Sequence, residues 1–385
     1  MRRYRYAAVV ALVVTGVVIA AGDASASSGG SSASTVVGHL YVNDNTTGVN
    51  TVAGFDRNAD GSLTPIAGSP FAVGGAGTGH ATASQGSLQL SADGRYLLAV
   101  DAGSNQISVV RIQHDGSLQT TGTDVVASNG IDPVSIAVHD SLVYVANAGA
   151  AGSNYTGFTL NAGGHLRALP GSTVSLPSDA QPGDVLFNGD GTKLVGTRVG
   201  TSQIDSFTVG SDGLLTAAPG SPFAAQGSGP FGSEFRPTNS TQLFVSNAHN
   251  GGINLGTVSA FAVAADGALT SIGSSPFNDL QNAPCWVEIS SDGQYLFAVN
   301  TASSSVSSYS IAAGGALTLI GSTPLAGAPA GAEDARLSPD GSTLWVVDAG
   351  ADAVSGFTVN GGTLEPLSSP TPGPAGASPS GIVVT

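Results

Sequence analysis

The sequence contains little cysteine and little charge. Cys285 is the only cysteine among 385 residues, so no disulfide can form within the chain and its stability has to come from packing. Charged residues make up 10% of the chain and hydrophobic residues 41%, which excludes intrinsic disorder, because disorder requires high charge and low hydrophobicity. Cys285 stands in an apolar stretch between Pro284 and Trp286, where a small buried side chain is expected rather than a nucleophile.

Positive charge is especially scarce. The chain has 11 Lys and Arg against 26 Asp and Glu, giving a formal net charge of −15. Such a surface repels nucleic acids and anionic lipids, so neither is expected as a partner. The sequence also lacks a G-x-S-x-G elbow, an H-E-x-x-H motif, a phosphate-binding loop and a Cys/His zinc pattern. The sequence therefore predicts no cofactor and no metal. Acidic side chains could bind Ca²⁺, but none of their clusters has the spacing of a dedicated calcium loop.

Residues 1–26 have the pattern of an export signal. Three arginines precede an apolar run over residues 7–21, and an Ala-Ser-Ala site follows, so cleavage is predicted before Ser27. The apolar run has 15 residues, which is short for a membrane span. Cleavage would leave a Ser/Gly-rich spacer (27–36), one domain (37–385), no membrane span and a net charge of −17. A monomer that is secreted or periplasmic is expected.

Sustained helical periodicity is absent beyond this segment, and short β patterns take its place. Residues 283–321 show the pattern most clearly, with apolar or alternating segments at 285–289, 295–299, 306–311 and 317–320. The segments have the usual length of strands, and Gly, Asp and Ser lie in the turns between them. The sequence therefore predicts a four-stranded meander that is repeated along the chain.

The turn before each final strand measures the repeat. It has the form Asp-Gly-x-Leu or Gly-Gly-x-Leu, and its last leucines are spaced by 55, 48, 49, 54, 48 and 47 residues. These leucines are Leu63, Leu118, Leu166, Leu215, Leu269, Leu317 and Leu364. Seven copies at this period predict an all-β fold, a seven-bladed β-propeller with four antiparallel strands in each blade.

The two ends of the chain complement each other. Residues 39–66 supply three strands without an innermost strand, and residues 381–385 form one strand with nothing after it. Together they make one complete blade. The C-terminal strand is therefore predicted to close the ring by joining the N-terminal blade, which removes an open sheet edge.

The repeated pattern P-x-x-x-x-x-S-x-D-G-x-x-L-x-V-x-N, followed by D-G-x-L, resembles the lactonase-like seven-bladed propellers. This family includes 6-phosphogluconolactonases and carboxymuconate-lactonising enzymes. The Gly-Ser-Pro-Phe pieces at 68–71 and 220–223 are similar to those of an exported branch with YVTN-type repeats and no assigned chemistry. The resemblance covers residues 38–385 and implies a propeller fold with lactone hydrolysis as its known activity.

The resemblance also implies where catalytic residues would lie. Active relatives carry a Pro-Arg-His run entering one innermost strand and an Asn-Glu pair at the end of the next strand. Pro230 and Asn247 match this pattern, but Phe231, Gly232 and Ala248 stand where Arg, His and Glu are expected. The basic and acid–base positions of the family are therefore lost in this chain.

Alternation along the innermost strands places polar side chains toward the central channel. One interpretation is a polar-ligand site at the channel mouth; the other is a hydrated channel whose ion pairs satisfy one another. Glu288 and Arg336 hold equivalent positions on adjacent blades, so they are predicted to form an ion pair. The candidate ligand-binding residues are Asp184, Trp286, Glu333, Asp334 and Asn247.

Two classes of function remain open. The first is a binding module for a small polar molecule or a component of the cell surface. The second is a lactone hydrolase with a rearranged site, and whether the protein is an enzyme is left uncertain. Its candidate catalytic residues are Glu234, Glu288, Arg336 and His249, of which His249 lies in a longer loop after Asn247. The missing Arg, His and Glu favour the binding module.

Overall fold

A computed structural model describes residues 34–82, 84–326, 331–367, 370–373 and 377–385. Residues 35–385 form one compact unit. The predicted export signal and the spacer up to residue 33 lie outside the described residues. In the part of the chain that is described, no helix is long and apolar enough to cross a membrane.

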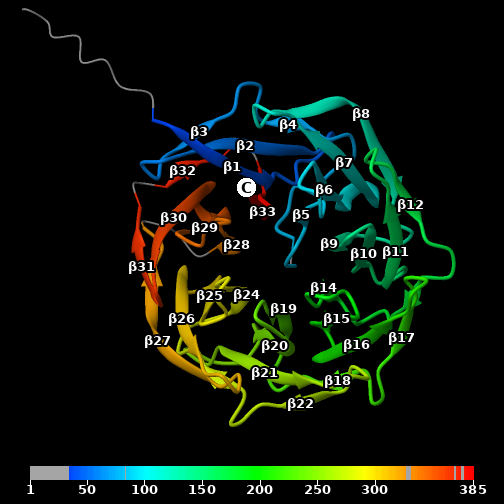
Figure 1. Ribbon diagram of the computed structural model, residues 1–385, viewed down its shortest axis with the longest axis vertical. Helices are drawn as coiled ribbons and strands as arrows, with labels where there is room; N and C mark the ends of the chain where they lie inside the picture. The colour runs from blue at the N-terminus through cyan, green and yellow to red at the C-terminus, as the bar shows by residue number, and fades with distance from the viewer. Residues whose placement is uncertain (1–33, 83, 327–330, 368–369, 374–376) are drawn as a thin grey trace, which may run out of the picture. The chain divides into compact units, whose positions relative to one another are not determined.

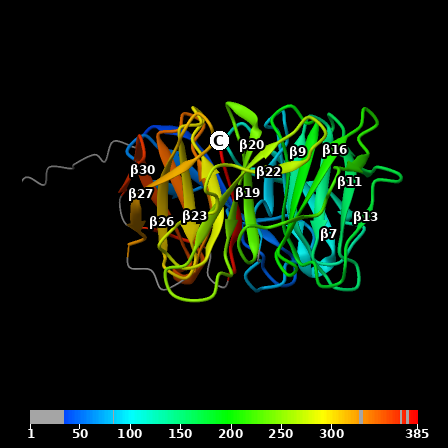
Figure 2. The same cartoon turned by 90° about the horizontal axis from the view of Figure 1, so that it is seen from below.

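Seven antiparallel sheets surround a central axis in the order in which they follow along the chain (Figure 1). Each sheet is a blade, and its first strand is innermost, against the first strands of the two neighbouring blades. Seen from the side, the strands run between the two end faces of the ring (Figure 2). The predicted seven-bladed propeller is therefore confirmed.

In each blade the four strands are named here in spatial order, from the innermost to the outermost. Blade 1 contains β33 (Ser380–Val384), β1 (Val36–Asn43), β2 (Thr51–Asn58) and β3 (Leu63–Pro65). Blade 2 contains β5 (Leu88–Leu90), β6 (Tyr96–Asp101), β7 (Gln106–Ile112) and β8 (Leu118–Ala127). Blade 3 contains β9 (Pro133–His139), β10 (Leu142–Asn147), β11 (Asn154–Leu160) and β12 (Leu166–Ala168). Blade 4 contains β14 (Pro182–Phe187), β15 (Lys193–Arg198), β16 (Gln203–Val209) and β17 (Leu215–Ala217).

The remaining blades repeat this arrangement. Blade 5 contains β19 (Pro230–Arg236), β20 (Asn239–Asn247), β21 (Thr257–Val263) and β22 (Leu269–Ser271). Blade 6 contains β24 (Pro284–Ile289), β25 (Tyr295–Asn300), β26 (Ser305–Ile311) and β27 (Leu317–Pro324). Blade 7 contains β28 (Ala332–Leu337), β29 (Thr343–Asp348), β30 (Ala353–Asn360) and β31 (Thr363–Pro366). Two 3₁₀ turns, η1 (Ala102–Ser104) and η2 (Ala349–Ala351), follow second strands.

Within the described ranges, five blades carry a short additional strand beside their third strand, which the sequence did not predict. These strands are β4 (Phe71–Ala72), β13 (Val174–Ser175), β18 (Phe223–Ala224), β23 (Phe277–Asn278) and β32 (Thr371–Pro372). Three of them, β4, β18 and β23, begin at the phenylalanine of a Ser-Pro-Phe piece. In the first piece, Ser69 Oγ accepts a hydrogen bond of 2.9 Å from the backbone N–H of Gly54 on the third strand of blade 1. This motif therefore has a structural role in docking the extra strand.

The hydrophobic core lies between neighbouring blades rather than at the centre of the ring. Tyr41 and Val52 of blade 1, for example, share one buried cluster with Leu88, Leu97 and Val110 of blade 2. The same alternation turns every second residue of an innermost strand toward the axis, where the polar side chains gather. Packing between blades therefore fixes which side chains face the channel.

The C-terminal strand closes the ring. β33 pairs antiparallel with β1, and the register places Val384 opposite Leu40 and Ile382 opposite Val42. β33 also contacts β28 of blade 7 and β5 of blade 2, which are its two neighbours around the axis. The predicted closure through the two ends of the chain is confirmed.

Candidate functional site

A segment of the connection between β4 and β5 fills one end of the central channel. We call residues 81, 82 and 84–87 the plug. Gln85 lies at its centre, where its backbone N–H donates to the Gly183 carbonyl at 2.9 Å and its side-chain Nε2 donates to the Ser233 carbonyl at 3.2 Å. The Gln85 Oε1 accepts a 3.0 Å hydrogen bond from the Val287 N–H. The backbone of Gln85 thus bonds to the innermost strand of blade 4, and its side chain joins those of blades 5 and 6.

Other plug residues bond to the remaining blades. Ser84 Oγ donates to the Val134 carbonyl of blade 3 at 2.7 Å, and the Ser84 carbonyl accepts from Trp286 Nε1 at 2.7 Å. The backbone N–H of Gly86 donates to Asp334 of blade 7, and Ser87 bonds to Ser380 of blade 1. The plug therefore contacts the innermost strands of all six other blades.

Gly232 leaves the room that the plug requires. A Cβ atom at position 232 would collide with Oε1 of Gln85 and lie 2.8 Å from the Cys285 carbonyl oxygen. A histidine at this position, as the family pattern implies, would need the space that Gln85 occupies. Because the end of the Gln85 side chain can move and the Cys285 carbonyl is part of the backbone, the neighbouring strand as well as the plug restricts the space at position 232.

Most carboxylates of the channel wall bond to the backbone of the next blade. Asp184 Oδ2 accepts from the N–H and the hydroxyl of Ser233 at 2.8 and 2.6 Å, and only 2% of Asp184 is exposed. Glu288 Oε1 likewise accepts from the Leu337 N–H at 2.9 Å. Buried acceptors of this kind are stabilising because the N–H groups they bind would otherwise lack partners. These side chains therefore fasten neighbouring innermost strands together.

Glu288 and Arg336 form the predicted ion pair. Arg336 Nη1 lies 3.1 Å from Glu288 Oε2, and 26% of the Arg336 side chain is exposed. Burial lowers the pKa of Arg336, but Glu288 and then Asp334 and Glu234 raise it, and the net shift is upward. Arg336 therefore stays positively charged in the channel wall, where it interacts electrostatically with Glu288, Asp334 and Glu234.

Two further carboxylates of the channel wall each have one enclosed oxygen without a hydrogen-bond partner among the described residues. They are Glu234 and Glu333, and in each the Oε2 atom is enclosed and unpaired within the described part of the chain. Burial, followed by the charge of Glu288, raises the pKa of Glu234 well above its usual value, although Arg336 and the Ile289 N–H oppose the rise. Burial, followed by Asp334, raises the pKa of Glu333. Both groups therefore hold their protons more tightly than an exposed glutamate.

The raised carboxyl pKa values predict how stability depends on pH. Burial raises the pKa of Asp184 to about 7, although hydrogen bonds from Ser233 and Ser135 oppose the rise. The folded state therefore binds this proton more tightly than the unfolded state, where the pKa is about 3.9. The resulting stabilisation is complete below about pH 4 and is lost as the pH rises through about 7. We expect the free energy of unfolding to fall between pH 5 and pH 8, and Asp184→Asn to make this slope shallower.

Guanidinium chloride unfolding at pH 5, 6.5 and 8 measures the slope. Asp190→Asn is the matched control, because hydrogen bonds from Thr192 hold the pKa of that exposed carboxyl below its usual value, outside this range. A slope that Asp184→Asn leaves unchanged would mean that Asp184 is already ionised at pH 5 in the folded protein.

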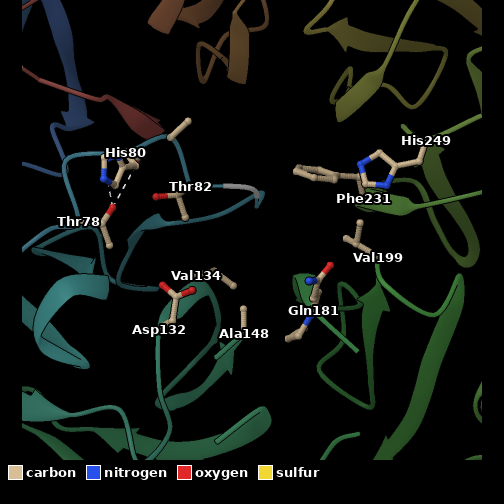
Figure 3. A pocket seen from close by; sticks show the side chains of 12 residues that line it. Thr78, His80, Thr82, Asp132, Val134, Ala148, Gln181, Val199, Phe231 and His249 are labelled. Carbon is tan, nitrogen blue, oxygen red and sulfur yellow. Dashed lines mark hydrogen bonds between the residues drawn. The ribbon is translucent and has the colours of Figure 1, made fainter. Parts of the chain in front are cut away.

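A pocket opens above the plug at the end of the ring that we call the mouth. Its volume is about 420 Å³, which falls within the usual range for small-molecule sites. Figure 3 shows His249 and Phe231 on one side of it and His80 and Thr78 on the other. The lining residues are Thr78, His80, Ala81, Thr82, Asp132, Val134, Ala148, Gln181, Pro182, Val199, Phe231 and His249. We call this the mouth pocket.

The mouth pocket combines an apolar base with polar groups. Val134, Val199 and Phe231 supply the apolar surface, and Phe231 is supported edge-to-face by Trp286 at 5.3 Å between ring centres. Asp132, Gln181 and His249 supply hydrogen-bonding groups, and burial raises the pKa of Asp132. The described lining contains no Lys or Arg. Such a pocket can hold an uncharged molecule that has one apolar face and several hydroxyl or carbonyl groups.

The candidate residues from the sequence therefore fall into two groups. His249 lines the mouth pocket, whereas Glu234, Glu288 and Arg336 are not among its lining residues and interact with one another in the channel wall. Trp286, Asp184, Asp334 and Glu333 are buried, and Asp334 and Trp286 bond to the plug. The catalytic and binding roles assigned to these residues remain predictions.

Asn247 is also buried and does not line the mouth pocket. Its Nδ2 donates to Ser259 Oγ at 2.8 Å and to Thr257 Oγ1 at 3.0 Å, which fixes the end of β20 to β21. Asn147 and Asn300 make equivalent bonds at the ends of β10 and β25. Within the described ranges, no group of three or more His, Cys, Asp or Glu side chains is arranged to hold a metal ion.

Sequence reasoning did not find most of the mouth pocket. Thr78, His80, Asp132 and Gln181 lie in connections outside the repeated pattern, and only His249 was singled out. One signal was present: the spacing from Leu63 to Leu118, which includes the plug, is 55 residues and the longest of the six.

Comparisons with known proteins agree with this fold. A profile of the family described as "Lactonase, 7-bladed beta-propeller" matches residues 47–178 and 234–381, which together exceed half of the chain. The unmatched interval contains Phe231, Gly232 and the plug partner Gly183. No curated protein matches the sequence.

Several solved structures share the fold at low sequence identity. A candidate 6-phosphogluconolactonase from Bacteroides uniformis has a TM-score of 0.72 at 19% identity, covering 90% of this chain and 99% of its own. One from Bacteroides fragilis gives 0.69 at 22%, covering 90% and 97%. The periplasmic gluconolactonase PpgL from Pseudomonas aeruginosa gives 0.70 at 19%, covering 90% and 99%. These likenesses support the fold alone.

Proposed function

The chain belongs to the lactonase family of seven-bladed β-propellers, and we propose that it binds a small uncharged polar molecule in the mouth pocket instead of hydrolysing a phosphorylated lactone. The observation that carries this proposal is the composition of the pocket. Phe231 lines the pocket, Gly232 lies against Gln85, and Ala248 is buried in one apolar cluster with Phe231. The described lining thus contains no Lys or Arg to stabilise a developing oxyanion, and Phe231, Gly232 and Ala248 stand where the family pattern has Arg, His and Glu.

The chemistry of the lining favours a hydroxyl-rich ring as the ligand. An apolar base can contact the C–H face of such a ring, and side chains such as Asp132, Gln181 and His249 can bond its hydroxyl groups. A phosphate group would find no Lys or Arg among the described lining residues. It would also approach a protein of strongly negative net charge.

Calorimetric titration of the mature protein with methyl β-D-glucoside tests the proposal. His249→Ala should weaken binding roughly two- to tenfold, the usual effect of one lost hydrogen bond. His114→Ala is the matched control, because His114 is exposed and lies next to the Asp115-Gly116 turn, outside the pocket. Equal effects of the two substitutions, or tighter binding of glucose 6-phosphate than of the glucoside, would contradict the proposed site.

A second candidate function is hydrolysis of a lactone, which family membership alone favours. In that case Glu234 or Glu288 would act as the base and Arg336 would stabilise the oxyanion, as in the rearranged hydrolase site that the sequence suggests. The plug separates these residues from the mouth pocket through its bonds to Asp334, Trp286 and Val287. Any substrate would therefore have to reach them from the opposite end of the channel.

We also propose that the protein is exported and processed. The basis is the sequence pattern of residues 1–26, which ends in Ala24-Ser25-Ala26. Intact-mass measurement of protein from the extracytoplasmic fraction should give a chain that begins at Ser27. A chain that keeps residues 1–26 would contradict this proposal.

A further inference from the structure

An arginine occupies an aliphatic position of the repeat in blade 1. Arg57 on β2 lies directly opposite Leu63, the leucine that marks the repeat in this blade. Opposed residues of an antiparallel pair share a face, and Leu63 belongs to the buried cluster between blades 7 and 1. In the other six blades the residue opposite this leucine is aliphatic: Ile112, Leu160, Val209, Val263, Ile311 and Val359. A cation therefore stands where the fold elsewhere uses hydrophobic packing.

The guanidinium of Arg57 is buried without a partner. Only 6% of Arg57 is exposed, and its Nε atom is enclosed with no hydrogen-bond partner among the described residues. None of the ion pairs in that part of the chain includes Arg57. Burial lowers the pKa of Arg57 and the charge of Asp340 opposes this, but Asp340 Oδ1 is bonded to Ser338 and Ser342. Because buried cations are normally paired, Arg57 lacks an anion.

Arg57 lines a groove between blades 7 and 1, where the ring closes. The groove includes the turn between β2 and β3 and the turn between β28 and β29, which places it at the end of the ring opposite the mouth. Its volume is about 700 Å³, within the usual range for small-molecule sites. We call it the seam groove, and its lining includes Val37, Arg57, Asp340, Thr343, Trp345 and Leu367.

The short side chain of Thr343 leaves the seam groove open. At the six other interfaces, the residue before the apolar run of the second strand lies against the glycine of the next blade's final turn. These covering residues are His39, Tyr96, Leu142, Lys193, Gln242 and Tyr295. Thr343 holds this place in blade 7, and the glycine that it faces, Gly61, lies near Leu367 instead. The opening thus results from a departure from the repeat, as the position of Arg57 does.

The lining restricts the kind of anion that fits. A guanidinium binds carboxylates and phosphates through two parallel hydrogen bonds. The net charge of −15 and the nearby Asp340 oppose every anion, and a multiply charged one most, which favours a monocarboxylate. Trp345 Nε1 already donates to Thr343 Oγ1 at 3.0 Å, so the indole offers apolar surface, and Val37 and Leu367 extend it.

We propose that the seam groove is a second binding site, which takes a small monocarboxylate with a flat apolar body. The carboxylate pairs with Arg57, and the body lies along Val37, Trp345 and Leu367. The seam groove shares no lining residue with the mouth pocket, so this inference is independent of the proposed function.

Ligand-observed ¹⁹F NMR titration of the mature protein with 4-fluorobenzoate tests the inference, with the uncharged 4-fluorobenzamide as the matched ligand. Arg57→Leu should weaken binding of the benzoate roughly ten- to hundredfold, the usual effect of losing a hydrogen bond to a charged group, and the benzamide should bind about as weakly. The same substitution should raise the melting temperature, because it removes an unpaired buried cation and restores the aliphatic residue of the other blades. A purely structural role of Arg57 predicts the opposite shift.

A second variant tests the site without changing Arg57. Thr343→Tyr introduces the side chain that Tyr96 and Tyr295 place at the equivalent position, so it should fill the groove and weaken binding of 4-fluorobenzoate at least tenfold. Arg111→Leu is the matched control, because Arg111 is an exposed arginine on the third strand of blade 2 and does not line the seam groove. It should leave the affinity unchanged.

Several results would overturn the inference. Binding that survives both Arg57→Leu and Thr343→Tyr, or that Arg111→Leu weakens equally, places the ligand elsewhere. No binding of 4-fluorobenzoate to the unsubstituted protein means that Arg57 needs no external anion. Inorganic phosphate that competes as well as the benzoate contradicts a carboxylate site. His249→Ala should not change the affinity for 4-fluorobenzoate, so failure here and failure of the mouth pocket are separate outcomes.

Discussion

Deletion of residues 380–385 is expected to lower the melting temperature by at least about 10 °C or to prevent folding of the monomer. The deleted strand β33 is the innermost strand of blade 1, and all five of its residues are buried. Loss of Ile382, Val383 and Val384 removes roughly 5–9 kcal/mol of hydrophobic stabilisation. That amount is comparable to the total stability of an ordinary domain, about 5–15 kcal/mol.

Circular dichroism melts of the full and truncated mature proteins measure this effect. A peptide with the sequence of residues 377–385, added in excess, should restore part of the lost stability because it can pair with β1 in the same register. A peptide of reversed sequence is the control. Truncated protein that melts like the full chain would show that β33 does not hold the ring closed.

Substitution Arg336→Met is expected to have the second largest effect on stability. Arg336 lowers the pKa values of Glu234, Glu288 and Asp334, so its removal leaves these carboxyls without their cation. Stranding a buried charge costs up to roughly 3–5 kcal/mol. Water at the exposed part of Arg336 should reduce the cost here, and protonation of the glutamates should reduce it further at low pH.

A double-mutant cycle with Glu288→Gln isolates the pair. Arg336→Met should destabilise the protein more than Arg336→Met and Glu288→Gln combined, because the second change removes the stranded charge. Urea unfolding at pH 8 measures the four free energies of unfolding, those of the unsubstituted protein, the two single variants and the double variant. Additive effects of the two substitutions would mean that the 3.1 Å contact contributes no coupling energy.

The ring could be predicted from the sequence because each blade repeats the same local signals. The Leu63-to-Leu364 series gave the number of blades, and the lone strand at residues 381–385 gave the closure. The Glu288–Arg336 pair could also be predicted, since equivalent positions on adjacent innermost strands face each other across a fixed distance. These inferences depend only on the alternation of side chains along each strand and on the repetition of the blades along the chain.

The plug could not be predicted from the same signals. Gln85 lies outside the repeated pattern, and its partners Gly183, Ser233 and Val287 follow it by about 100 to 200 residues in the chain. Nothing in the local sequence of the plug indicates that its residues enter the channel. The sequence marks Gly232 only as a position where the family pattern has histidine, whereas in the fold a Cβ atom there would meet both Gln85 and the Cys285 carbonyl oxygen.

The rate of lactone hydrolysis by the purified mature protein tests most directly whether this propeller has kept the family fold without the family chemistry. The substrates are 6-phosphogluconolactone and simple γ- and δ-lactones, followed by proton release at neutral pH. The account predicts no turnover above the spontaneous rate, because Phe231, Gly232 and Ala248 supply neither a base nor an oxyanion partner. Turnover well above that rate, lost in both Glu234→Gln and Arg336→Met while both variants remain folded, would contradict the account and identify an enzyme with a relocated site.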